Sequence, residues 1–286
     1  MTAVTMEATQ AVAPTPSAGR SGPSLAMRFA KGLLNTALSI GVVLAAWVLF
    51  LELKDIPPFM RKGPADVWAY LFTDAEAATN RSVIWSESKT TLRDAWLGLT
   101  AGTVAAVVAS IAFTMWRPVE RTFMPIAMVL PSVPLVATTP LIVLIFGRDL
   151  QAITVIAGIV TFFPTLVNVT IALKSTPKDS LDLMRAYGAS PLRTLFKVQV
   201  PSALPALFAS LRIASPLALI GALLAEWLAT GKGLGYTILQ AGSLFDYNGL
   251  WARVVIVTLY SILLYKAVGV LERLVMNRFG AVAPRR

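Results

Sequence analysis

Residues 174–205, KSTPKDSLDLMRAYGASPLRTLFKVQVPSALP, separate two long apolar runs, and their pattern decides how the chain is organised. The segment is too charged to cross a membrane. It predicts a helix behind Pro177, capped by Asp179 or Ser180. The helix is expected to stop at Gly188, because glycine suits the turn after a helix. Its apolar residues recur at near-helical spacing, at Leu181, Leu183, Met184 and Tyr187.

A second short helix is predicted from Pro191 to about Val198. Ser190 is its expected N-cap, and Pro201 is expected to close it. The two helices make a helix–turn–helix outside the membrane that leads directly into the next apolar run. It exposes methionine, leucine and tyrosine where no lipid is needed, which suggests a docking surface for another protein. An amphipathic helix resting on lipid head groups is the alternative.

The composition predicts an integral membrane protein. Of the 286 residues, 56% are hydrophobic and 14% are charged, whereas soluble domains carry roughly 25% charged residues. Cysteine and histidine are absent, which excludes thiolate and imidazole catalysis and metal sites built from those side chains. The net charge of +10 is explained by basic residues retained on the cytoplasmic side, and nucleic acid is not an expected partner.

Six apolar runs are each long enough to cross a bilayer, so the fold class is an all-α protein with six transmembrane helices. These runs are 33–51, 95–116, 122–146, 151–173, 205–228 and 251–271. The third run should be broken or strongly kinked, because prolines withhold backbone donors. Its prolines either line a transport pathway or only shape helix packing, and they are Pro125, Pro131, Pro134 and Pro140.

The basic residues set the expected orientation. With both termini in the cytoplasm, 14 lysines and arginines lie inside and 8 outside, as the positive-inside rule favours. Segments 53–94 and 230–250 are then outside, and Asp66–Phe72 reads as a short interfacial helix. The expected division is a disordered cytoplasmic tail, a membrane domain containing the loop 174–203, and a basic cytoplasmic tail, at 1–24, 25–277 and 278–286.

The loop also resembles a known family. Permeases of binding-protein-dependent ABC importers share the pattern E-A-A-x3-G-x9-I-x-L-P, and the spacing is met here by Asp182-Leu183-Met184-x3-Gly188-x9-Val198-x-Val200-Pro201. The residue types differ from the family pattern at five positions. Asp182 replaces the glutamate, Leu183 and Met184 replace the two alanines, and Val198 and Val200 replace the isoleucine and the leucine. GASPLRTLFKVQVPSALPALFASLRIA, AEWLATGKGLGYTILQAG and PLIVLIFG are similar to the sulfonate, taurine and nitrate branch. The resemblance runs from about Pro57 to Leu274.

The resemblance implies a six-span permease of the type I fold in a bacterial inner membrane. Its implied partners are a second permease copy, identical or paralogous, two ATP-binding subunits and a solute-binding protein. It would move a sulfonate, taurine, nitrate or a vitamin precursor inward by alternating access. The implied ATPase-docking residues are Asp182, Leu183, Met184, Arg185, Tyr187, Gly188, Ala189, Ser190 and Pro191.

The chain itself is not expected to be an enzyme or to bind a cofactor or metal. ATP and Mg²⁺ would belong to the partner, because no G-x-x-x-x-G-K-[ST] motif is present and the glycines of 231–235 lack that spacing. The alternative function is a secondary transporter that works without ATP. Such a transporter predicts intramembrane carboxylates in repeated halves, and only Glu226 qualifies.

Several single residues have two possible roles. Glu226, with Gly233 and Gly235, is a candidate outer gate or binding-protein contact, or it pairs with Lys232 or Arg253. Asp182 either pairs with a basic residue of the ATPase or favours its own helix N-terminus. Arg212 either meets an anionic solute or holds neighbouring carbonyls. The candidate pathway residues are Pro131, Pro134, Thr138, Thr165, Asn168 and Arg212.

Overall fold

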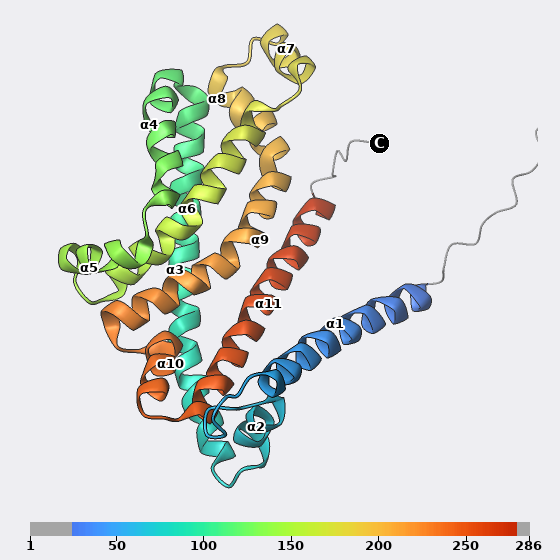
Figure 1. Cartoon of the computed structure of the whole chain (residues 1–286). Coiled ribbons are helices and arrows are strands. Elements are labelled where there is room, and N and C mark those ends of the chain that lie inside the picture. The colour runs from blue at the N-terminus through green and yellow to red at the C-terminus, as the bar shows by residue number, and fades with distance from the viewer. Residues whose placement is uncertain (1–24, 279–286) are drawn as a thin grey trace, which may run out of the picture. The chain divides into compact units, whose positions relative to one another are not determined.

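The computed structural model describes residues 25–278, which form helices without any strand (Figure 1). The predicted tails, apart from Arg278, lie outside the described residues. The chain divides into two compact units, 1–55 and 56–286. In the first, α1 spans Leu25–Leu53, and the side chains described in it are mostly exposed.

The second unit contains long helices joined by short connections. Three of its elements are five-residue π-helical turns, at Ala69–Thr73 (η1), Leu195–Gln199 (η3) and Glu226–Thr230 (η4). A 3₁₀ turn, η2, covers Leu130–Ser132. The α-helices are α2 Pro64–Trp68, α3 Ala77–Met115, α4 Arg117–Val129, α5 Leu135–Phe146, α6 Leu150–Lys174, α7 Lys178–Ala186, α8 Pro191–Thr194, α9 Val200–Ala225, α10 Gly233–Ser243 and α11 Tyr247–Arg278.

Among the described residues, four helical segments are long and apolar enough to cross a membrane. They are α3, α6, the continuous run 191–230 and α11. A fifth span is formed if α4 and α5 are counted together, and these two are bent by 111° at the break between them. The apolar part of α1 found among the described residues, Ala37–Leu53, is shorter. The total of six spans therefore stays a prediction, while the break in the third is confirmed.

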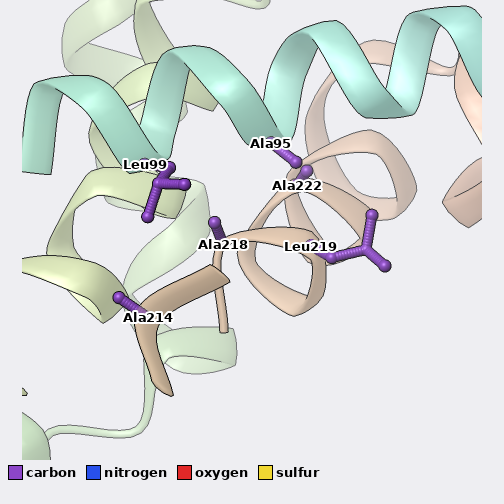
Figure 2. Packing of buried hydrophobic residues seen from close by; sticks show 6 residues of the cluster. All are labelled: Ala95, Leu99, Ala214, Ala218, Leu219 and Ala222. Atoms are coloured by element: carbon purple, nitrogen blue, oxygen red, sulfur yellow. The ribbon is translucent and has the colours of Figure 1, made fainter. Parts of the chain in front are cut away.

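Small residues let α3, α6 and α9 pack closely. A Cβ atom built on Gly221 of α9 would lie 2.7 Å from the Cα of Ala157 in α6. On α3, a Cβ on Gly98 or Gly102 would collide with α6. Close backbone approach of this kind is how apolar helices associate where the hydrophobic effect gives no driving force. Figure 2 shows the α3–α9 contact, which is built by Ala95, Leu99, Ala214, Ala218, Leu219 and Ala222.

The second unit has two distinct ends. Figure 1 shows α7 and α8 at one end, here called the α7 end, and α2 and α10 at the opposite, α10 end. At the α7 end, Lys174 closes α6 with an ion pair to Glu120, near the start of α4. The Nε2 of Gln199 also donates to the carbonyl of Leu173, at 3.1 Å. These contacts tie the start of α4 and the turn η3 to the end of α6.

Two local predictions are wrong. Neither Asp179 nor Ser180 caps α7, because the helix begins at Lys178 with Pro177 in the N-cap position. Pro201 does not close a helix either, since α8, η3 and α9 run on without interruption. The π-helical η3 explains this, because the amide of Val200 bonds to the carbonyl of Leu195 and the wider turn accommodates the proline that follows. The helix predicted at Asp66–Phe72 is present as α2 and η1, while its location at the membrane interface stays a prediction.

Candidate functional site

The turn between α7 and α8 has the predicted geometry. Gly188 adopts a φ of +66°, and its amide donates to the carbonyl of Arg185 at 2.9 Å. The hydroxyl of Ser190 accepts from the amide of Arg193 at 3.3 Å, which caps α8 as expected. The turn is thus set by a left-handed glycine and a serine cap, both of which close off backbone groups locally.

The residues around this turn form an exposed surface at the α7 end. Tyr187 is 81% exposed and Leu183 58% exposed, although both are large and apolar. Asp182 forms an exposed ion pair with Arg185, at 3.0 Å, one turn along α7. Met184 and Ala189 are half-buried. The remaining predicted docking residues, Gly188, Ser190 and Pro191, are exposed.

A cavity of about 260 Å³ lies beneath this surface. Thr114 and Met115, at the end of α3, line it together with Arg185 of α7. The turn and the end of α3 therefore line the same cavity.

A second cavity, of about 310 Å³, lies at the break between α4 and α5. Its walls come from the break, from α6 and from α9, so three proline-containing spans meet there. The lining is largely apolar and consists of Leu130, Pro131, Val133, Leu135, Ile159, Val160, Phe163, Pro164 and Leu217.

Of the predicted pathway residues, Pro131 lines this cavity and Pro134 is exposed next to it. The Thr138 hydroxyl donates to the carbonyl of Leu135 within α5, at 3.1 Å. Thr165 is fully buried, and its hydroxyl donates to the carbonyl of Thr161 at 2.9 Å. Asn168 is half-buried in α6. The cavity walls therefore include the predicted break but not the predicted polar residues.

Arg212 has a partner that the sequence analysis missed. Its guanidinium forms an ion pair with Glu272 of α11 and lies 5.6 Å from the ring centre of Tyr265. The pair joins α9 to α11 and neutralises the arginine. The two residues are 60 positions apart, and no local pattern connects them.

Glu226 lies at the α10 end and is fully buried. Its Oε2 accepts from the Thr91 hydroxyl at 3.0 Å and from the Gly235 amide at 2.8 Å. Thr91 also accepts from the amide of Leu234, at 2.9 Å. The side chain thus joins α3, η4 and α10. The expected pairing with Lys232 or Arg253 is not what holds it, because Lys232 is exposed and Arg253 binds elsewhere.

Arg253 forms a bidentate ion pair with Glu87 of α3. The two hydrogen bonds are 2.8 and 3.0 Å long, and the side chains are 9% and 12% exposed. Nearby, burial and the Asp246 carboxylate raise the pKa of Tyr70 in η1. The buried ion pair between Arg253 and Glu87 joins the first turns of α11 to α3.

Comparisons with known proteins agree with this arrangement. A probable ABC transporter permease of Haemophilus influenzae is 32% identical over 82% of this chain and 93% of its own length. The riboflavin transport system permease of Chloroflexus aurantiacus is 30% identical over 87% of this chain and 92% of its own length. The branch noted in the sequence is also represented, since taurine, aliphatic sulfonate and nitrate permeases match at 23 to 26% identity.

The fold also has a solved counterpart. A chain of the MetNI methionine ABC transporter, in an inward-facing conformation, superposes with a TM-score of 0.58 at 20% identity, over 71% of this chain and 99% of that one. Residues 98–280 match the family described as binding-protein-dependent transport system inner membrane component. This match includes α6, α9, the turn between α7 and α8, and the part of α3 from Gly98 onward. The chain therefore belongs to that family and is an ABC importer permease subunit.

Proposed function

We propose that the chain carries a small solute inward by alternating access, driven by ATP hydrolysis in two partner subunits that dock on the α7 end. The exposed surface formed by Leu183, Tyr187 and the turn at Gly188 carries this proposal. It is apolar, held in a defined geometry, and located where the basic-residue count places the cytoplasm. ATP and Mg²⁺ would be held by the partners.

The connections on either side of the turn would transmit movement to the spans. Three residues, 175–177, join α6 to α7. On the other side, the run 191–230 is one continuous helical segment that includes α8 and α9. Both α6 and α9 also line the cavity at the break. A displacement of the docked turn would therefore tilt the helices that form the cavity walls.

Replacing Gly188 by valine is expected to release the ATP-binding subunits, whereas Gly188→Asn should retain them. A Cβ at this position meets nothing within 4 Å, so the effect is conformational. Left-handed backbone costs most residues about 1–2 kcal/mol, and asparagine least, which lowers the population of the correct turn by about 5–30-fold. The measurement is the yield of ATP-binding subunits that co-purify with tagged permease. Equal yields from both variants would contradict the docking assignment.

A second permease copy is proposed to cover α5. Leu144 and Ile145, near the end of α5, are 81% and 73% exposed, and Pro131 and Pro134, in the irregular backbone before α5, are exposed as well. Lipid cannot satisfy carbonyl groups of irregular backbone at membrane depth, so protein or a water-filled cavity must face the break. A copy of the same chain would provide such a cover and enclose the cavity between two subunits.

Single cysteines along α5 are expected to cross-link two permeases. The chain has no native cysteine, so variants at Leu141, Leu144 and Ile145 report only on these positions. At least one should give a covalent dimer with a short bifunctional thiol reagent in native membranes. Leu263→Cys on α11, 59% exposed, is the control expected to stay monomeric. Dimers from the control alone would place the interface elsewhere.

The solute is proposed to be an uncharged vitamin-like molecule with a flat aromatic ring system, such as riboflavin. The cavity at the break has an apolar lining with Phe163 in its wall. Arg212 and Arg253 are each paired with a glutamate, so neither leaves an uncompensated charge for an anion. The riboflavin permease is also a nearer relative than the taurine, sulfonate and nitrate permeases.

Proteoliposomes that contain the complete complex and its solute-binding protein should take up riboflavin in preference to taurine. Uptake should require ATP inside the vesicles, on the side of the ATP-binding subunits. A preference for taurine would overturn the solute proposal. Uptake without ATP would instead favour a secondary transporter.

A further inference from the structure

The hydrogen bonds around Glu226 form a compact latch at the α10 end. The latch is defined here as Glu226, Thr91 and the amides of Leu234 and Gly235. Glu226 is the first residue of η4, Thr91 lies on α3, and the two amides belong to the first turn of α10. Three separate elements are therefore held together by three hydrogen bonds in a buried position.

The glycines of 231–235 are required by the latch. Gly231 and Gly233 have φ values of +67° and +84°, which fold the chain back sharply after η4. A Cβ on Gly233 would collide with the Glu226 carboxylate, and one on Gly235 would lie 2.8 Å from the Cα of Leu223. This glycine-rich stretch thus receives a carboxylate of the same chain at the N-terminus of α10, where free amides and the helix dipole favour an anion.

The latch is connected to the cavity at the break. Ala225, the residue before Glu226, packs with Ile153 and Ile156 of α6 in a cluster that also contacts Leu135 and Ile142 of α5. Leu135 lines the cavity as well. A change in the position of α5 would therefore act directly on the residue next to the latch, through packed side chains that cannot deform continuously.

The element that contains Glu226 is also built to rearrange. In η4, the amide of Gly231 bonds to the carbonyl of Glu226, which makes one wide π-helical turn between α9 and Gly231. Single π-helical turns of this kind within helices are frequently found at functional sites. Gly231 and Gly233, on either side of Lys232, have left-handed backbone and supply a hinge after η4.

We propose that this latch holds α10 against α3 when the α10 end is closed, and that it opens once in every transport cycle. The inference rests on the alternating-access function proposed above, with the α10 end on the outer side. Glu226 and Thr91 are positioning residues in this scheme, because they hold α10 and do not touch the solute.

The first test ties the latch shut. Thr91→Cys and Leu234→Cys are combined in the cysteine-free chain, and uptake by the complete complex is measured before and after oxidation. Oxidation should lower uptake by about tenfold or more, and reduction should restore it. Ala95→Cys with Ala222→Cys is the matched control, because this pair also joins α3 to a neighbouring helix but lies in the packed contact of Figure 2. Uptake that is the same in the oxidised and reduced latch variant would overturn the proposal.

The second test uses the unmodified complex, so it does not depend on how the variants fold. Hydrogen exchange is compared for a peptide covering residues 231–238, without nucleotide and with ATP trapped by vanadate. The amides of Leu234 and Gly235 should be protected in one state and exchange at least about tenfold faster in the other. A peptide covering residues 153–161 of α6 is the internal control.

The outcomes separate the latch from the function. Equal protection of the latch peptide in both states, in a complex that transports with ATP, would overturn the latch and leave the function standing. If the complex binds ATP-hydrolysing subunits but transports no solute, the proposed transport function is refuted, and the latch proposal that rests on it falls with it.

Discussion

Permease in which Gly102 is replaced by valine is expected to be recovered in very low yield and to unfold at a much lower temperature than the unchanged chain. A Cβ at Gly102 would overlap the Thr161 hydroxyl and the Gly158 carbonyl oxygen, and it would lie 3.1 Å from the Gly158 carbonyl carbon. The obstacle is backbone, so α3 and α6 must separate along their whole contact. Overpacking typically costs about 1–3 kcal/mol, and this site is expected at the upper end of that range because backbone atoms cannot move aside.

The matched control is Gly41→Val in α1, where a Cβ meets nothing within 4 Å. Both changes place the same β-branched residue in a helix, so propensity cancels in the comparison. The measurement is the melting temperature of detergent-solubilised permease. It is obtained from the amount of intact protein that size-exclusion chromatography recovers after heating to each temperature. Equal melting temperatures for the two variants would show that the close contact of α3 with α6 is not needed for stability.

Replacing Arg253 by methionine is expected to destabilise the permease by about 3–5 kcal/mol. Glu87 would then stay almost buried without its partner, since its side chain is only 12% exposed. Changing Glu87 to leucine in the same chain should recover most of the loss, because the uncompensated charge is removed as well. Denaturant titration of the single and double variants gives the coupling energy of the pair.

Arg185→Met is the control for this prediction. Arg185 also forms an ion pair, with Asp182, but those side chains are 77% and 67% exposed, so solvent screens the interaction. Its loss should hardly change stability. If Arg253→Met were equally harmless, the buried pair would contribute nothing that packing alone does not supply.

The sequence predicts well those features that depend on a few neighbouring residues. The left-handed turn at Gly188 and the cap at Ser190 follow from the chemistry of single side chains. The break in the third span follows from prolines that withhold donors. The charge of the loop likewise predicts that it lies outside the membrane.

The sequence does not reveal contacts between distant helices. Glu87 and Arg253 are 166 positions apart, and Thr91 and Glu226 are 135 apart. Each of these residues has several possible partners of suitable chemistry, and only the packing of α3 with α9 and α10, and of α11 with α9 and α10, selects one. The π-helical turns were also missed, because their wide hydrogen bonding depends on neighbouring helices more than on local propensity.

The length of α3 has a mechanical consequence. The helix has 39 residues without interruption, which corresponds to about 58 Å, nearly twice the hydrocarbon thickness of a bilayer. Met115 at one end lines the cavity beneath α7, and Thr91, about 36 Å back along the helix, contributes to the latch. One continuous helix thus contributes to both the latch and the cavity beneath α7. A tilt imposed on α3 at this cavity would therefore also displace Thr91, as part of the same rigid body. Communication across the bilayer would then need no sequential relay of side-chain rearrangements.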